Sequence, residues 1–540
     1  MSRYRIACVA ALLVTLATYA NHFHNDFHFD DSHTVQNNGF IRSLRNIPRF
    51  FIGPATFSSL PSNQSYRPVV TTTLAVDYRL GRGLNPLAFH VTSFSLFLVQ
   101  CVLLLALYRR LMDHARPDAD NRWLALLVAA WYALHSANAE TVNYIIARSE
   151  ILSTLGVVLA LLLFAGGGIA RRYHPLPDSG SARGPQQGAG RDGRAGAVHL
   201  RRVLRTRAVD ARTARAARAD RRPSRHLAVL RRLLRQRRHR MRLATTYTPG
   251  GTSRWQYLLT QPLVIVHYML SLFLPVHLSA DTYWPLVMDP LDGGVLIGGA
   301  WITVVLAIAW VTSRRRETQP IAFGLLRFFV TLLPTSSLVP LSEPMNDHRM
   351  YLPFVGLVLA VVSTAGLALR EASARTRMVA AGVAVDVIAA MVYGTRQRNI
   401  VWRTEESLWH DATIKSPDNG RGLMNYGVIQ MEKGNYPLAD QYFARALLLT
   451  PHYSYLHVNL GVLKAALGRP AWAERHFREA QHDDPNNPVC YTPFARFLKG
   501  LLRTEEARLF AARAVELSPA DADATRLLND LAVSRSKIAK

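Results

Sequence analysis

The sequence predicts an all-α protein in which a helical membrane domain precedes a domain of repeated helix pairs. Nine apolar runs occupy much of the first 395 residues, and a 34-residue period follows from about residue 416. Hydrophobic residues make up 49% of the 540 residues. Three cysteines are too few for a disulfide framework, so we expect them to be unpaired.

The apolar runs have the length of membrane helices. A membrane-spanning helix needs about 20 mostly apolar residues. The runs lie near residues 6–23, 86–108, 123–137, 151–168, 258–276, 294–312, 320–340, 351–369 and 378–394. The first run follows MSRYR and could be a cleaved signal peptide, but the eight later runs favour an uncleaved first helix.

Basic residues predict an orientation for these helices. They precede the first run and follow the second, fourth, sixth and eighth, in the stretches YRRLMDHAR, GIARRYH, SRRRE and LREASARTR. Lys and Arg favour the cytoplasmic side of a membrane. Since all these stretches can share that side, we expect the opposite side to carry residues 24–85, 138–150, 341–350 and those after about 395.

Small, aromatic and proline residues recur in phase in the C-terminal part. The columns are Gly427, Gly461 and Ala495; Ala439, Ala473 and Ala507; Phe443, Phe477 and Ala511; Ala446, Ala480 and Ala514; and Pro451, Pro485 and Pro519. Small residues let paired helices pack closely, and proline ends the second helix. This is the tetratricopeptide pattern, which predicts an α-solenoid with a concave face. That face could bind a protein acceptor or serve only as a docking scaffold.

An acidic pair follows the first apolar run. Asp30 and Asp31 stand beside Phe27 and Phe29, where the chain leaves the first helix. Carboxylates at that depth are costly without partners or a function. An apolar surface raises a carboxyl pKa and makes the carboxylate a better base toward a hydroxyl. A helix cap or a solvated loop is the alternative. The pair could also hold a divalent metal, although two carboxylates alone establish no metal site or cofactor.

Five segments, in this order, carry a resemblance to a known family. They read FHFDD, YRPVVTTTLAVDYRLGRGLNPLAFH, ALHSANAETVNYIIARSEILS, YLLTQPLVIVHYMLSLFLPVHLSAD and RFFVTLLPTSSLVPLSEPMNDHRMYLPFVG, and the repeats follow. Together they resemble the transmembrane and tetratricopeptide-repeat-containing O-mannosyltransferases and their bacterial relatives, glycosyltransferases of the GT-C type. The resemblance covers most of residues 5–165 and 255–535.

The resemblance implies sugar transfer from a lipid carrier. A membrane enzyme of this family would move a mannose-like sugar from polyprenyl or dolichyl phosphate to a protein or glycan hydroxyl. The sequence has no Gly-rich nucleotide loop, which fits a lipid-linked donor. The alternative is a membrane-anchored repeat scaffold without catalysis.

The resemblance also implies roles for matching residues. Asp30 and Asp31 fall on the acidic pair of the first external loop, where one would act as base or orient the acceptor hydroxyl. Contacts with donor and substrate would come from Tyr66, Arg67, His135, Glu140, Arg148, Asp347, His348 and Arg349. Arg67 and Arg349 could bind the donor phosphate, because guanidinium groups match phosphate oxygens bidentately. Loop salt bridges, lipid-headgroup contacts and helix-end capping are the alternatives.

A basic block interrupts the membrane region. Residues 171–243 hold 22 Arg and 4 Asp without Lys or Glu, which accounts for +18 of the net charge of +27. By resemblance, residues 170–250 should instead contain apolar spans and a loop reading roughly SKEQG. One choice of synonymous codons for residues 186–193, CAG CAA GGA GCA GGG CGT GAT GGC, reads SKEQGVM when the first base is dropped, so the protein sequence is compatible with a shifted frame.

We therefore hypothesise a frameshift from about residue 173 to about residue 250, which resequencing of the gene would test. A disordered linker, a patch for anionic lipid and a nucleic-acid arm are the alternatives. No folded nucleic-acid-binding module accompanies the charge, so we expect no nucleic-acid partner. If the block is translated as written, membrane spans are missing and we expect impaired catalysis.

The predicted organisation has four parts. They are an N-terminal transmembrane part with the first external loop (1–172), the Arg/Ala/Gly-rich segment (173–250), a second transmembrane part (251–395) and repeats within 416–535, at 420–453, 454–487 and 488–521. The expected partners are the membrane, a lipid-phosphate sugar donor and a protein acceptor. We expect a bacterial inner membrane with periplasmic repeats, or the endoplasmic reticulum membrane with lumenal repeats in a eukaryote.

Overall fold

The described part of the chain is helical and contains no strands, as the predicted all-α class requires. The computed structural model describes residues 2–60, 63–165, 253–337, 340–341, 343–519 and 521–538. The segment expected at 173–250, with its hypothesised frameshift, lies outside the described residues.

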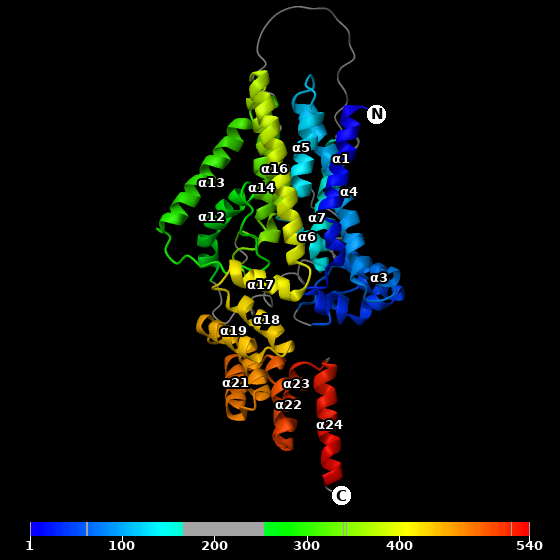
Figure 1. Cartoon of the computed structure of the whole chain (residues 1–540), viewed down its shortest axis with the longest axis vertical. Helices are drawn as coiled ribbons and strands as arrows, with labels where there is room; N and C mark the ends of the chain where they lie inside the picture. The colour runs from blue at the N-terminus through cyan, green and yellow to red at the C-terminus, as the bar shows by residue number, and fades with distance from the viewer. Residues whose placement is uncertain are drawn as a thin grey trace, which may run out of the picture. The chain divides into compact units, whose positions relative to one another are not determined.

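The described chain divides into two compact units (Figure 1). Unit 1 comprises the described residues up to 165 together with 253–276 and 286–400. Unit 2 comprises 277–285 and the described residues from 401 onward. A short segment between two helices of unit 1 therefore belongs to unit 2.

Unit 1 contains six described helical segments that are long and apolar enough to cross a membrane. They are α1 (Arg3–Thr18) with the turn Ala20–His24, α4 (Pro86–Ala115), α7 (Arg148–Ala165) with the turn Ile145–Ala147, α13 (Gly293–Thr312), α15 (Tyr351–Ala368) with the turn Asp347–Met350, and α16 (Ala374–Val401). The other three predicted runs coincide with shorter or less apolar helices. These are α5 (Arg122–Leu134), α12 (Arg254–Ser271) and α14 (Gln319–Leu332). The chain is an integral membrane protein.

Shorter helices cover one end of unit 1. They are α2 (Ile47–Phe50), α3 (Pro68–Leu80) and α6 (Asn138–Asn143). Proline begins α3, where its fixed backbone angle suits the first helical turn. Figure 1 shows α1, α4, α5 and α7 running side by side above these elements, and their packing contacts agree.

Helices α14 and α15 approach each other backbone to backbone. A Cβ atom on Gly324 would lie 2.3 Å from the carbonyl oxygen of Gly356, and one on Gly356 would lie 2.4 Å from that of Gly324. Small residues permit such close crossings between membrane helices. The crossing fixes α15 and with it the preceding turn, which carries three expected site residues.

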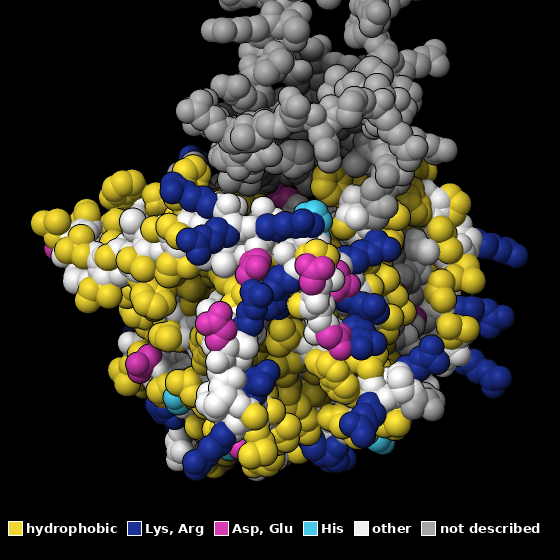
Figure 2. Space-filling view, turned by 90° about the horizontal axis from the view of Figure 1, so that it is seen from above, with side chains coloured by type: hydrophobic (Ala, Val, Ile, Leu, Met, Phe, Trp, Pro, Cys, Tyr) yellow, Lys and Arg dark blue, Asp and Glu magenta, His cyan; other side chains and the backbone are white. Residues whose placement is uncertain are grey.

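Three of the basic stretches, YRRLMDHAR, SRRRE and LREASARTR, meet at one end of unit 1. Arg316 Nε donates a hydrogen bond to the carbonyl of His114 (2.8 Å), and Arg370 pairs with Glu317 at 3.1 Å. Figure 2 shows Lys and Arg side chains gathered with acidic ones on the face seen from above, with hydrophobic side chains around them. The pattern of basic residues predicts this grouping for one membrane face.

Unit 2 is built from helix pairs at the spacing that the repeat pattern predicts. After α17 (Glu405–Lys415) come α18 (Gly420–Glu432) and α19 (Tyr436–Leu449), α20 (Ser454–Ala466) and α21 (Pro470–Asp483), α22 (Thr492–Gly500) and α23 (Thr504–Leu517), and α24 (Ala522–Ile538). A Cβ on Gly427 would lie 2.6 Å from the Phe443 ring, and one on Gly461 would lie 2.7 Å from that of Phe477. The glycines therefore make room for the aromatic rings between the helices.

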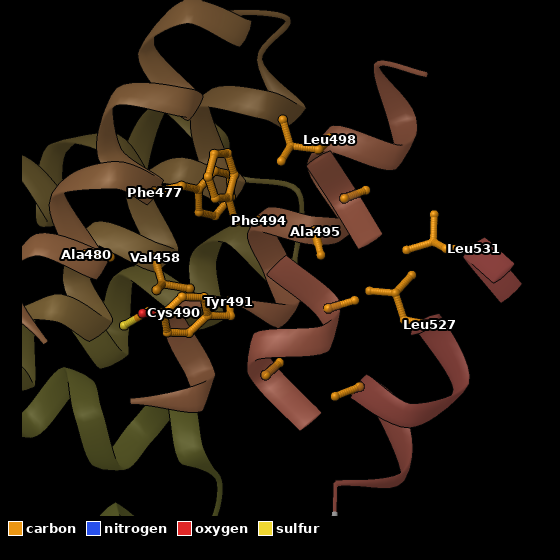
Figure 3. Packing of buried hydrophobic residues seen from close by; sticks show 14 of the residues in the cluster. Val458, Phe477, Ala480, Cys490, Tyr491, Phe494, Ala495, Leu498, Leu527 and Leu531 are labelled. Carbon is orange, nitrogen blue, oxygen red and sulfur yellow. The ribbon is translucent and has the colours of Figure 1, made fainter. Parts of the chain in front are cut away.

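The alanine columns of the repeats lie in the core. Ala473, Ala480, Ala507 and Ala514 are fully buried, and Figure 3 shows the cluster around Phe477 to which they belong. The rings of Phe477 and Phe494 stack with centroids 5.3 Å apart. Close helix packing thus brings aromatic side chains of successive pairs into contact.

Each helix pair turns through one residue in the left-handed backbone region. The turn residues are Gly434 (φ +78°), Gly468 (φ +67°) and Leu502 (φ +59°), spaced by the repeat period. Only glycine adopts this conformation without steric cost from Cβ. The third repeat therefore carries a strained leucine.

Residues 277–285 pack onto the first helices of unit 2. Arg421 donates two hydrogen bonds to the buried Asp281 carboxylate, each 2.7 Å long. Lys415 Nζ donates to the carbonyl of Leu278 at 2.9 Å. This segment is therefore part of the fold of unit 2, although it precedes that unit by more than 100 residues.

Candidate functional site

The two carboxylates of the acidic pair lie in different environments. Asp31 is fully buried, and its oxygens accept hydrogen bonds from the backbone N–H groups of His28 (3.1 Å) and Ile146 (3.0 Å). The Asp30 side chain is 55% exposed, and its Oδ1 lies 3.3 Å from His33 Nε2. Asp31 thus anchors the first external loop, whereas Asp30 is open to solvent.

Their pKa values move in opposite directions. Burial raises the pKa of Asp31 to about 7, and the charge of Asp30 adds to the rise. Burial also raises the pKa of Asp30, but hydrogen bonds and charge from His33 and Tyr144, with the charge of Arg67, outweigh it and lower that pKa. Asp30 is therefore ionised at neutral pH, and it is the more accessible base.

The backbone and neighbouring side chains hold Asp30 in place. Its N–H donates to Tyr144 Oη at 3.1 Å, and the supporting His33 has its Nδ1 2.9 Å from Ser58 Oγ. Phe29, immediately before, has φ +49°, in the left-handed region. Such strained residues cluster at functional sites, where the surrounding structure enforces them.

Arg67 lies beside the acidic pair without an acidic partner of its own. One terminal nitrogen donates to Ser149 Oγ at 3.3 Å, and the guanidinium carbon lies 5.0 Å from the centre of the Phe57 ring. The side chain is exposed, and within the described chain no carboxylate forms a salt bridge with it, although its charge acts on Asp30. This guanidinium can accept a phosphate ligand.

Two other expected ligand-binding side chains bond to backbone carbonyls. Tyr66 Oη donates to Phe51 at 3.0 Å. Arg349 donates from its two terminal nitrogens to Pro344 (3.3 Å) and Glu343 (2.9 Å). These contacts fix both side chains in their loops, and Arg349 stays partly exposed.

A second charged group forms around Glu140. His348 Nδ1 lies 3.1 Å from Glu140 Oε1, and His267 Nε2 lies 3.8 Å from Asp347 Oδ1. Burial raises the pKa of Glu140, while His348 opposes the rise. The charges of Asp347 and Arg398 also act on Glu140. Helices α6, α12 and α16 and the turn before α15 thus contribute to one cluster.

Residues 138–150, between α5 and the start of α7, join the two groups. Ile146 binds Asp31, Ser149 binds Arg67, and the charge of Glu150 acts on His348. The loop after α1, residues 138–150 and the turn before α15 therefore meet at one end of unit 1. These are the segments that the basic-residue pattern predicts for a single side.

Two expected site residues support the interior. His135 is fully buried, with Nε2 3.1 Å from the carbonyl of Leu272. Arg148 is fully buried, pairs with Asp77 at 2.5 Å and donates to the carbonyl of Phe89 at 2.7 Å. Burial raises the pKa of Asp77, and the Arg148 charge opposes the rise. In this structure both side chains hold helices together.

A buried cluster of amide side chains, which the sequence does not predict, lies at the same end of unit 1. Asn143 Oδ1 accepts a hydrogen bond from Asn25 Nδ2 (2.6 Å), and Asn143 Nδ2 donates to Asn399 Oδ1 (2.7 Å). His22 Nδ1 lies 2.8 Å from Asn143 Oδ1. The cluster joins the ends of α1, α6 and α16. The signal was polar residues at the ends of apolar runs, as in NHFHN and RQRN.

Known proteins with similar sequences are named protein O-mannosyl-transferases. Mouse protein O-mannosyl-transferase TMTC4 is 23% identical over 501 residues, which cover 80% of this chain and 64% of the relative. Drosophila melanogaster protein O-mannosyl-transferase Tmtc3 is 23% identical over 558 residues, with 88% and 58% covered. The human TMTC4 protein is 28% identical over 158 residues, with 28% and 21% covered.

The chain is similar over most of its length to proteins named protein O-mannosyl-transferase. This finding confirms the resemblance on which the expected site residues rest. The chain spans less than two thirds of the length of each of these three relatives. No family model matches it.

Proposed function

We propose that the chain is an integral-membrane glycosyltransferase that moves a mannose-like sugar from polyprenyl or dolichyl phosphate to a protein or glycan hydroxyl. The names of its relatives support a mannosyltransferase role. The observation that carries the proposal is the ionised, half-exposed Asp30 carboxylate, whose neighbour Arg67 has no acidic partner within the described chain.

In the proposed reaction, Asp30 takes the proton of the acceptor hydroxyl. The hydroxyl oxygen then forms a bond to C1 of the sugar, and the bond between C1 and the phosphate oxygen breaks. The lipid phosphate leaves with the electron pair, and Arg67 offsets its charge. Proton transfer to a positioned carboxylate contributes roughly 10²–10⁴-fold to such a rate.

Asp31 is the positioning residue in this proposal. Both of its oxygens accept backbone hydrogen bonds, so it has little capacity left for a substrate. It fixes the loop that carries Asp30 to the turn Ile145–Ala147, directly before Arg148 and Ser149 of α7. A proton-accepting role for Asp30 and a structural role for Asp31 follow from this difference in exposure.

The second charged group would contact the remainder of the substrates. We assign binding of the donor headgroup or the acceptor to Glu140, Asp347, His348 and Arg349. Tyr66 would hold the loop that carries Arg67 in place. The repeats, at the boundaries that the sequence predicts, would bind a polypeptide acceptor. We propose that they face the same compartment as Asp30, because the end of α16 bonds to the end of α1 through Asn399 and Asn25.

The test is sugar transfer by the full chain in lipid nanodiscs, with radiolabelled mannosyl-phosphopolyprenol and a Ser/Thr-rich peptide. We expect Asp30→Asn to lower the turnover rate more than about 100-fold. Asp26→Asn is the matched control, because this exposed aspartate lies in the same loop. The assay includes the gene as written and a version with the alternative frame between residues 173 and 250.

A wild-type rate that Asp30→Asn leaves unchanged would contradict the proposal. The scaffold alternative predicts no transfer from either gene version. It also predicts that partners captured in cells survive the joint change of Asp30 and Asp31 to Asn.

A further inference from the structure

Three metal-ligand atoms converge in a cleft of unit 2. His457 Nδ1 lies 3.2 Å from His476 Nδ1 and 3.2 Å from Glu479 Oε2, and the last two atoms are 3.3 Å apart. Ligands bound tetrahedrally to Zn²⁺ at about 2.0–2.1 Å lie roughly 3.3 Å from one another. The triangle has this size on every side. Within the described chain, these three residues form the one group of at least three His, Cys or carboxylate ligands whose binding atoms lie close together.

The repeat fold brings these residues together. His476 and Glu479 are three positions apart on α21 and so share one face of that helix. His457 faces them from α20, with only 4% of its surface exposed. The three ligands therefore come from rigid, packed helices, which preserves their geometry when an ion binds.

The second nitrogen of His457 shows which atom is free to bind. Nε2 lies 2.8 Å from the carbonyl oxygen of Pro451. A carbonyl only accepts hydrogen bonds, so Nε2 carries a hydrogen, and in this tautomer Nδ1 is the nitrogen that can bind a metal ion. Asp483 Oδ2 lies 3.7 Å from the same Nε2. Histidine ligands of metals commonly donate their other N–H to a carbonyl or carboxylate in this way.

The carboxylate is oriented similarly. Glu479 Oε1 accepts a hydrogen bond from Arg475 Nε at 3.0 Å, while Oε2 faces the two imidazoles. Nδ1 of His457 and Oε2 of Glu479 lie 3.2 Å apart, a separation at which both atoms can bind one cation.

We propose that His457, His476 and Glu479 bind a divalent transition-metal ion, with Zn²⁺ the best chemical match. Imidazole and carboxylate ligands suit Zn²⁺, and three protein ligands leave a fourth position open. That position faces a cleft of about 690 Å³, whose lining includes Trp472 and Lys464. Lys464 is paired with Asp440 at 2.6 Å, which offsets its positive charge near the ion. No step of the proposed sugar transfer uses this site.

The test is Zn²⁺ titration of the tag-free full chain after chelator treatment, in competition with a chromophoric chelator. We expect one equivalent to bind. Loss of a residue that only hydrogen-bonds a metal ligand weakens metal affinity roughly 10- to 100-fold. Because His457 and His476 would bind the ion directly, His457→Gln and His476→Gln should each weaken the Zn²⁺ affinity by more than that. His452→Gln and His482→Gln are matched controls, because both histidines line the cleft and are largely exposed. These two variants should bind as the wild type does.

A further variant separates ligand loss from misfolding. Glu479→His keeps a ligand at the third position and should retain binding, with the visible absorption of tetrahedral Co²⁺ as a second measurement. Thermal unfolding without metal shows whether each variant folds. The proposal is overturned if the folded wild type binds no ion, or if His457→Gln and His476→Gln bind as tightly as the controls. In either case the three side chains form only a hydrogen-bonded network within the repeats.

Discussion

The backbone N–H of Ile146 donates a 3.0 Å hydrogen bond to the carboxylate of Asp31, across 115 residues of sequence. This bond fixes the loop after α1 to the turn before α7. It also leaves one acidic side chain buried and its neighbour exposed, which is the basis of the division of roles between Asp31 and Asp30.

Asp31 should make the stability of unit 1 depend on pH. An unfolded aspartate has a pKa of about 4, whereas burial raises that of Asp31 to about 7. The fold therefore favours the protonated form, whose contribution to the free energy of unfolding is full below pH ~4 and is lost as the pH rises through about 7. Melting temperatures across this range should fall for the wild type and for Asp26→Asn. Asp31→Asn should flatten that slope, and an unchanged slope would contradict the assignment.

The buried pair of Arg148 and Asp77 should be essential for stability. Both side chains are fully buried. Arg148→Met leaves the carboxylate without its partner, and breaking a buried pair costs about 3–5 kcal/mol. Denaturation in mixed micelles measures this loss. The joint change of Arg148 to Met and Asp77 to Leu removes both charges and should cost less than the single change, whereas equal losses would argue against a buried pair.

Leu502→Gly should stabilise unit 2. Leu502 occupies the left-handed turn position that glycine holds in the two preceding repeats, and its side chain is 88% exposed. The left-handed conformation costs a residue with Cβ about 1–2 kcal/mol, of which the greater chain entropy of glycine cancels part. We expect a net gain of roughly 0.5–1 kcal/mol in the free energy of unfolding. The matched control, Gly468→Ala, should lose stability in the same thermal assay.

The contact of Arg421 with Asp281 should stabilise unit 2 measurably. Arg421→Ala leaves a carboxylate that is 4% exposed without its two hydrogen bonds. Hydrogen bonds to charged groups contribute about 1.5–3 kcal/mol each, so we expect a loss of at least about 1.5 kcal/mol. Arg508→Ala removes an exposed pair with Glu505 and should cost at most about 0.5 kcal/mol. Similar losses in both variants would contradict this ranking.

The sequence predicts the helices better than it predicts their ends. Apolar runs locate the membrane helices because lipid-facing surface must be apolar along its whole length. The last run was expected to end at 394, yet α16 continues to Val401. Its polar residues Thr395 and Asn399 are fully buried and bond to other helices, which hydropathy does not register.

The candidate site shows the same limit. The sequence marks Asp30 and Asp31 as candidate catalytic carboxylates. Their different exposure, however, depends on contacts with Ile146 and Tyr144, more than 100 residues later. Likewise, His457 and His476 lie on different helices, and the helix-pair geometry of the repeats brings them together. Contacts between distant residues set these properties, and a single sequence does not reveal them.

The order of synthesis gives the Arg148–Asp77 pair a further consequence. The two residues are 71 positions apart, so Asp77 leaves the ribosome well before its partner exists. Until α7 arrives, this carboxylate lacks the guanidinium that pairs with it in the folded unit. Mutations that delay α7 should therefore leave the nascent chain open to membrane quality-control proteases for longer.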